Sequence, residues 1–416
     1  MNEQLIVKNF GPIKDATVDF KRVTVFIGPT GGGKSTLAKL AAILKKGETD
    51  ENGVFDANFS FKDVSIDRYI QSATEVEWTN SKGTGIKIGD PEGVNIDNLL
   101  ASDETHDTMP VAQLNNVIAG KNRANFEHLK TDVIKNLKDR GVLDIDENRL
   151  QEIIRLATEE IEKKLVDTFY KKNIFPTETH YLPSERSFIA AIGYSWPGFL
   201  RDDIGLPKPI LDFANSFSTS RKTILELPIS FLDITYIHSD GQDFIRVPGV
   251  ETLFRLYETA SGIQSVTPLL VLLEHLSRNI EQAQSFIIEE PELNLYPTAQ
   301  QGLLDWLVEK CTKGANDLTI TTHSPYILSH LNLLLYAYQV AEKHPDRAEE
   351  VAELVPRVSW INPKEFACYQ VENGGVTSLV SEDLGLIDDN GLDNLSGDAA
   401  DAFDNLIRLS KGVARK

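Results

Sequence analysis

The sequence predicts an α/β fold, with a mixed β-sheet flanked by helices. Residues 23–27 form a β-prone run that leads into a glycine-rich turn, and residues 37–44 beyond the turn favour a helix. Residues 285–290 and 318–323 are two further apolar strands, which end in a pair of carboxylates and in a histidine. Because the ends of parallel strands meet at one edge of such a sheet, these polar residues are predicted to face a common site.

The glycine-rich turn has the spacing of a phosphate-binding loop, Gly-x-x-x-x-Gly-Lys-Ser/Thr. Glycines allow the backbone N–H groups to point inward, and the positive end of the following helix faces the phosphates. Lys34 is predicted to reach the β- and γ-phosphates, and the Ser35 hydroxyl to ligate Mg²⁺. The predicted nucleotide contacts in this loop are Gly28, Pro29, Thr30, Gly31, Gly32, Gly33, Lys34, Ser35 and Thr36.

The composition is that of a globular protein, with 416 residues, 41% hydrophobic and 25% charged. The sequence has no apolar run of about 18 residues and no signal-peptide pattern, so no membrane association is expected. Its only cysteines, Cys311 and Cys368, exclude a disulfide framework and a cysteine-rich zinc site, which favours a reducing cytoplasm. A net charge of −20 favours protein partners over bare nucleic acid, although it does not forbid DNA binding.

Further elements are predicted in chain order. Residues 4–20 indicate two short strands around Gly11, and the helix after the phosphate loop is expected to end at Gly47. Hairpins are expected at residues 75–88 and 231–247, and a strand ending in a turn at 179–186. Amphipathic helices are predicted at residues 126–137 and 150–165, and an acidic tail containing a helix at 402–409 follows residue 376.

The two later strands carry the candidate catalytic residues. Glu289 is predicted to orient Mg²⁺, and Glu290 to polarise the attacking water, because a hydrolase needs paired carboxylates at a strand end. His323 would contact the γ-phosphate or the water, with Ser324 and Pro325 as the cap and first residue of a helix. Ser261 and Gly262 are predicted to open another helix near an apolar run.

Taken in order, these motifs resemble the ABC-type ATPase head shared by the SMC, RecF and OLD families. The resemblance covers about residues 1–45 and 225–380, and the elements at 7–13, 28–35, 288–297 and 321–328 are most similar to the OLD branch. It implies a P-loop NTPase of ABC-ATPase type that binds ATP and Mg²⁺, with Glu290 as general base and His323 as switch histidine. It also implies that Ser261, Gly262 and Gln264 of one protomer cap the ATP held by Lys34 of another. The glutamine-loop residue stays open between Gln71 and Gln113.

Four segments follow from this resemblance: the first part of the head (1–47), a variable lid with a helical insertion (48–224), the second part of the head (225–380) and an acidic tail (381–416). No metal-dependent nuclease module is found after the histidine, so a nuclease or toxin effector is expected on a separate subunit. Stand-alone heads of this kind resemble the ATPase subunits of bacterial anti-phage systems. The alternative is a DNA-engaging ATPase of the RecF/SMC repair type; a transporter subunit and a metabolic kinase are disfavoured.

Overall fold

The computed structural model describes residues 3–47, 61–80, 85–88, 98–100, 177–191, 206–279 and 281–388, together with Phe403, Leu406 and Ile407. The last three are helical and lie within the helix predicted at 402–409. The helices predicted at 126–137 and 150–165, and Gln113, lie outside the described residues. The four segment boundaries stay predictions.

The first sheet begins with the predicted N-terminal hairpin. Strands β1 (Glu3–Phe10) and β2 (Ile13–Phe20) pair antiparallel, and Gly11 in the turn takes a positive φ of 54°. The predicted second hairpin, β4 (Ile70–Thr79) with β5 (Gly85–Ile88), pairs through β4 onto β1. With β6 (Asn98–Leu100) the order is β2-β1-β4-β5-β6.

The central sheet has six strands in the order β15-β14-β3-β13-β12-β7. Its members are β3 (Val23–Ile27), β7 (Glu178–Leu182), β12 (Gln284–Glu289), β13 (Asp317–Thr321), β14 (Phe366–Glu372) and β15 (Gly375–Ser378). All neighbouring pairs are parallel except the β14–β15 hairpin, so the sheet is mixed, as predicted. The parallel register brings the C-terminal ends of β3, β12 and β13 to one edge.

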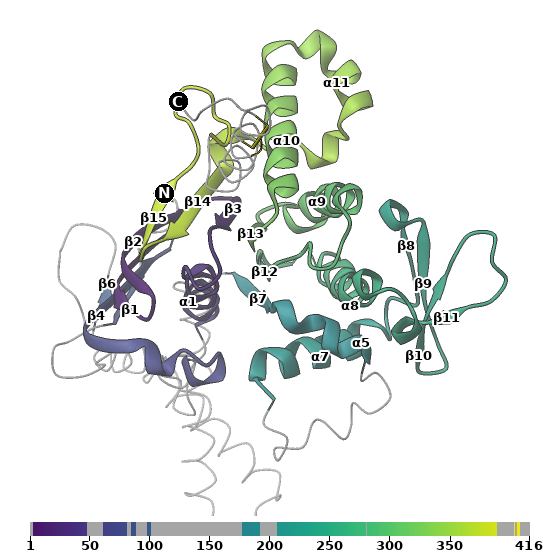
Figure 1. Ribbon diagram of the computed structural model, residues 1–416, viewed down its shortest axis with the longest axis horizontal. Coiled ribbons are helices and arrows are strands. Elements are labelled where there is room, and N and C mark those ends of the chain that lie inside the picture. Colours follow the sequence, from purple (N-terminus) through teal and green to yellow (C-terminus); the bar gives the residue numbers. More distant parts are fainter. Residues whose placement is uncertain are drawn as a thin grey trace, which may run out of the picture.

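Helix α1 (Lys34–Lys46) lies between the two sheets (Figure 1). It packs with Phe26, Ile287 and Val371 of the central sheet and with the first sheet in one hydrophobic core. The opposite face of the central sheet packs on a second core with α7 (Lys208–Ser220), α8 (Ser261–Leu276), α9 (Pro297–Cys311) and α10 (Pro325–Lys343). The central sheet therefore separates two cores.

Shorter elements complete the described chain. The predicted hairpin at Asp240 forms between β9 (Ile234–Ser239) and β10 (Gln242–Arg246), in a four-stranded sheet with β8 (Glu226–Ile229) and β11 (Phe254–Arg255). Helices α5 (Ser187–Ala191) and α11 (Ala348–Leu354) are short. Cys311 and Cys368 are both buried and unpaired, as expected. Among the described residues, no helix combines the length and the apolar character needed to cross a membrane.

A buried lysine holds the C-terminal end of α1 in place. The Lys45 ammonium donates to Glu3 (2.8 Å), Asp317 (2.9 Å) and Ser285 (3.2 Å), and so joins α1 to β1, β13 and β12. Burial opposes its charge, but Asp317 and Glu3 outweigh burial and raise the pKa of Lys45. The helix then ends at Gly47 in the left-handed conformation, where its N–H caps the Ile43 carbonyl.

Candidate functional site

The phosphate loop spans the chain between the end of β3 and the start of α1. Gly28 has a φ of 142°, and a side chain there would lie 2.2 Å from the carbonyl oxygen of Val371 on β14. Only glycine adopts this φ readily and has no side chain that would clash with that carbonyl. Gly33 caps α1 at a φ of 112°, so that the first N–H groups of the helix border the loop. The sequence pattern and the backbone agree here.

Lys34 is buried, and its ammonium donates to the carbonyls of Gly28 (2.8 Å) and Pro29 (2.9 Å). Burial lowers the pKa of Lys34, whereas the carboxylates of Glu290, Glu289 and Glu292 raise it. The parallel order β3-β13-β12 places the end of β12, which carries these acids, at the same edge of the sheet as the loop.

The other predicted loop residues lie around Lys34. Pro29, Thr30 and Gly31 are exposed at the tip of the loop, and Gly32 is partly exposed. Ser35 is exposed in the first turn of α1, whereas Thr36 is buried. Six of the nine predicted contacts are therefore open to solvent to some degree, namely the five residues from Gly28 to Gly32 together with Ser35.

Glu289 is the last residue of β12 and is 4% exposed. Burial raises the pKa of its carboxyl, and the Ser35 hydroxyl, Lys39 and the Tyr181 phenol act in the opposite direction. Among the described residues, Glu289 Oε1 is buried without a hydrogen-bond partner. A buried oxygen of this kind beside a serine hydroxyl suits a hard cation.

Glu290 leaves the strand in a different direction. Its φ of 41° is left-handed, which is unusual for a residue with a side chain, and its N–H donates to the Thr321 carbonyl (3.0 Å). The turn brings Glu290 Oε1 to 3.5 Å from His323 Nε2. Burial and Lys34 lower the pKa of His323, while Glu290 raises it, so the net effect favours the neutral imidazole.

Two functional candidates escape the sequence analysis. Glu292 is buried and accepts from the Thr322 hydroxyl (2.5 Å) and from the His323 N–H (3.1 Å), so it holds the turn that carries the histidine. The sequence feature that could have identified Glu292 is its position two residues after the carboxylate pair. Arg186 approaches the same strand end from a segment about a hundred residues upstream in sequence, and no spacing pattern predicts that contact.

The predicted helix does begin at Ser261, where Ser261 is exposed and Gly262 is buried. A side chain at Gly262 would lie 2.6 Å from the Asn294 carbonyl, so this turn packs directly against the segment after β12. The Gln264 amide donates to the carbonyls of Tyr257 and Thr259. Among the residues that the structure describes, no hydrogen bond joins Ser261, Gly262 or Gln264 to Lys34 of the same chain. Gln71, on β4, donates to the Gly11 carbonyl.

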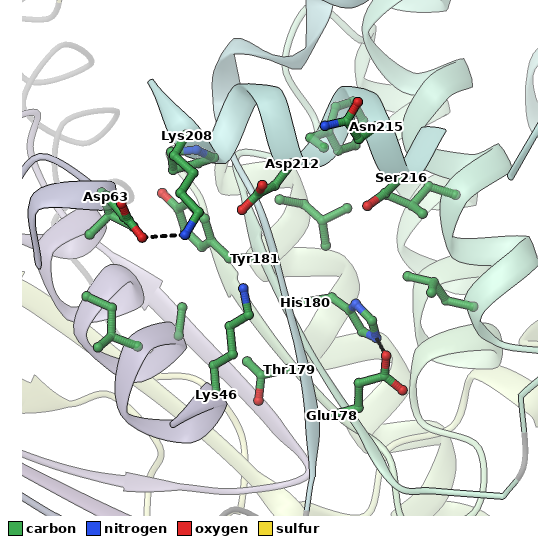
Figure 2. Close-up of a pocket in the computed structure, with 18 of the residues that line it drawn as sticks. Lys46, Asp63, Glu178, Thr179, His180, Tyr181, Lys208, Asp212, Asn215 and Ser216 are labelled. Atoms are coloured by element: carbon green, nitrogen blue, oxygen red, sulfur yellow. Dashed lines mark hydrogen bonds and ion pairs between the residues drawn. The ribbon is translucent and has the colours of Figure 1, made fainter. Parts of the chain in front are cut away.

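A cavity of about 1110 Å³ lies beside this site, between α1, β7 and α7 (Figure 2). Its wall includes His180 and Tyr181 of β7, and the Lys208–Asp63 ion pair crosses it. None of the phosphate-loop residues lines it. Tyr181 lines this cavity, and burial and then Glu289 raise the pKa of its phenol.

Comparisons with solved structures found distant similarity to SMC head domains. The SMC head bound to the C-winged helix domain of ScpA is 8% identical, with 90% of this chain and 96% of that chain covered and a TM-score of 0.39. The Pyrococcus furiosus head bound to the C-terminal domain of ScpA is 13% identical (90% and 95% covered, TM-score 0.39), and the Thermotoga maritima head 12% (92% and 100%, 0.38). These scores are too low to carry a functional assignment.

The comparison with family models is decisive. A comparison with curated proteins gave no significant match. The family described as an AAA ATPase domain matches residues 1–192 and 98–328, which together span well over half of the chain. That match agrees with the phosphate loop and the mixed sheet flanked by helices, and it confirms the prediction of an ATPase head with a P-loop NTPase fold. The chain therefore belongs to the AAA ATPase domain family, and it binds and hydrolyses ATP.

Proposed function

We propose that this protein is a Mg²⁺-dependent ATPase whose ATP-bound heads assemble into a homo-oligomer, and that this assembly controls a separate protein effector in anti-phage defence. The observation that carries the proposal is the convergence of Lys34, Glu290 and His323 from three distant parts of the sequence. His323 Nε2 lies 3.5 Å from Glu290, and the charges of Lys34 and Glu290 both act on the imidazole. A phosphate-binding lysine and a carboxylate base at one site support ATP hydrolysis as the activity.

The residues around Glu289 fit a magnesium ion. Glu289 offers a buried carboxylate oxygen without a hydrogen-bond partner among the described residues, and Ser35 offers a hydroxyl beside it. Mg²⁺ prefers oxygen ligands and retains several waters, so two protein ligands are sufficient. When bound, the ion would neutralise charge on the phosphate oxygens.

Three side chains of the protein, Lys34, Glu290 and His323, have separate proposed roles in hydrolysis. Lys34 would exchange its contacts with the Gly28 and Pro29 carbonyls for the β- and γ-phosphates. Glu290 would accept a proton from the attacking water, and the neutral His323 beside it would donate a hydrogen bond to the γ-phosphate. Glu292 fixes the His323 backbone while this happens. A general base of this kind contributes a factor of about 10²–10⁴ in rate.

Assembly is proposed to use the first turn of α8. Ser261 is exposed there, and Gly262 fixes the turn against the segment that follows Glu290. Because the Gln264 amide already donates within its own chain, its carbonyl oxygen is the atom available to a neighbouring protomer. Ser261, Gly262 and Gln264 of one protomer would thereby close over ATP held by the other. Because this turn packs against the segment after Glu290, a conformational change at the end of β12 would be accompanied by a change at the interface between protomers.

The charge supports a protein effector. A net charge of −20 repels DNA phosphates, and the acidic sequence after residue 380 favours a basic protein partner. The two buried, unpaired cysteines fit a reducing compartment, and we place the protein in the cytoplasm. The DNA-engaging alternative predicts ATP-dependent DNA binding that weakens steeply with salt.

Mass measurement of the purified protein with and without ATP tests this proposal. Glu290→Gln should retain ATP and accumulate as the assembled form, whereas Lys34→Ala should lose ATP binding and stay unassembled. Lys313→Ala, at an exposed lysine away from the loop, is the matched control and should behave as wild type. Identical masses for all variants with and without ATP would contradict assembly. Purification from the host without a stoichiometric partner protein, together with salt-sensitive DNA binding, would favour the repair-type function.

A further inference from the structure

Arg186 is a charged residue buried at the centre of the candidate site. It ends the short 3₁₀ helix Ser184–Arg186 that follows β7, and its exposure is 0%. Its Nη1 donates to the carbonyls of Pro183 (3.1 Å) and Glu289 (2.6 Å), and its Nη2 donates to the carbonyl of Glu290 (2.5 Å). Burial lowers the pKa of the guanidinium to about 10, so it stays charged at neutral pH. The contacts are made to the backbone, not to the carboxylates.

Those two carbonyls flank the point where the chain turns out of β12. Glu289 is still extended and points its carboxylate toward Ser35, while Glu290 takes a left-handed φ of 41° and approaches His323. A left-handed conformation is unfavourable for a residue with a side chain, and it persists only where its surroundings hold it. The Glu290 N–H is held by the Thr321 carbonyl (3.0 Å), and the carbonyls on both sides are held by Arg186.

Burying the guanidinium is costly for stability alone. An ion withdrawn from water into a protein loses several kcal/mol of hydration, and hydrogen bonds to neutral carbonyls restore only part of that. Among the described residues, Arg186 Nε is also buried without a hydrogen-bond partner. An apolar side chain of similar volume would pack in this position at lower cost. What it would lack is a planar fork of donors that reaches two successive carbonyls.

We propose that Arg186 is a positioning residue for ATP hydrolysis. Its fork fixes the left-handed turn that separates the two carboxylates, so that Glu289 faces the metal site and Glu290 faces the attacking water. Arg186 donates its hydrogen bonds to backbone carbonyls, so it would act through Glu290. This inference rests on the proposed role of Glu290 as general base. The segment directly after β7, which carries Arg186, would therefore set the orientation of Glu290.

The test compares Arg186→Lys with Arg221→Lys. Lysine keeps the charge but has no fork, and Arg221 is a part-buried arginine whose pair with Asp243 (2.8 Å) lies outside the site. Arg186→Lys should lower kcat at least 30-fold and change the Kd for ATP less than threefold. Arg221→Lys should change neither. Thermal unfolding of each variant shows whether the fold is intact, and Arg186→Gln, which is neutral and keeps a planar amide, serves as the second variant if Arg186→Lys does not fold.

The double variant Arg186→Lys/Glu290→Gln decides whether Arg186 acts through Glu290. If it does, the double variant turns over no more slowly than Glu290→Gln alone. Multiplicative losses, an ATP affinity that falls in parallel with kcat, or wild-type kcat in Arg186→Lys would each overturn the inference. Wild-type turnover by Glu290→Gln alone is a different result: it would remove the proposed base, and any kcat loss in Arg186→Lys would then have to arise without Glu290.

Discussion

Replacing Lys45 by methionine tests how the buried lysine orients α1. Methionine ends where the Cε of lysine lies, so it keeps most of the apolar stem but removes the ammonium that contacts Glu3, Asp317 and Ser285. Breaking a buried ion pair by removing one partner costs about 3–5 kcal/mol, because the other charge stays buried and uncompensated. The carboxylates here keep 16–18% of their side-chain surface exposed, so we expect the lower end, about 3 kcal/mol.

Urea unfolding measures this loss as a change in the free energy of unfolding. Lys313→Met, at an exposed lysine, is the control and should stay within about 0.5 kcal/mol of wild type. Lys45→Met/Asp317→Asn removes both charges of one pair, and it should recover at least 1 kcal/mol relative to the sum of the two single losses. Strictly additive losses, or an effect of Lys45→Met no larger than that of the control, would refute the reasoning.

Three further outcomes are expected. Gly28→Ala should weaken ATP binding more than tenfold in titration calorimetry, because the added methyl group would meet the Val371 carbonyl at 2.2 Å. Gly249→Ala is the control, because Gly249 also has a positive φ, of 77°, but has open space around it, and this variant should bind ATP as wild type does. Glu292→Gln should lower kcat about tenfold in a phosphate-release assay with ATP affinity unchanged, since the His323 backbone loses a charged acceptor worth about 1.5–3 kcal/mol. Burial, followed by the charge of Lys46, lowers the pKa of His180 from 6.5 to about 4, so the unfolded state binds more protons between these values and stability falls as pH drops through that window. This loss of stability is at most about 3 kcal/mol. The free energy of unfolding of His180→Gln, measured in urea between pH 7 and 4, should therefore fall less steeply with falling pH than that of the wild type.

Local signals account for what the sequence predicted well. The β3–loop–α1 unit, the hairpins and the helix opened by Ser324 and Pro325 each depend on residues close together in the chain, such as the glycine at 28 and the serine whose hydroxyl caps α10. Periodicity, caps and turn residues are sufficient for such elements. The convergence of Lys34, Glu290 and His323 also followed, because parallel strands deliver their ends to the same edge.

Contacts between segments that are distant in the sequence could not be predicted from it. The sequence around Arg186 does not indicate that β7 pairs with β12. It also does not indicate that the carbonyls of Glu289 and Glu290 accept the hydrogen bonds of Arg186. The left-handed turn at Glu290 was equally hidden, since glutamate has no preference for that conformation and only the surrounding hydrogen bonds impose it. The cavity beside Tyr181 depends on the same unpredicted placement of β7.

The position of β3 has a consequence for biosynthesis. This strand lies between β13 and β14, so Val23–Ile27 pairs with Leu318–Thr321 on one side and with Phe366–Gln370 on the other. At a synthesis rate of about 5–20 residues per second, the newly made phosphate loop waits for tens of seconds before its neighbouring strands leave the ribosome. During that interval an apolar strand is without partners on either edge, so nascent chains should depend on chaperones to remain free of aggregation.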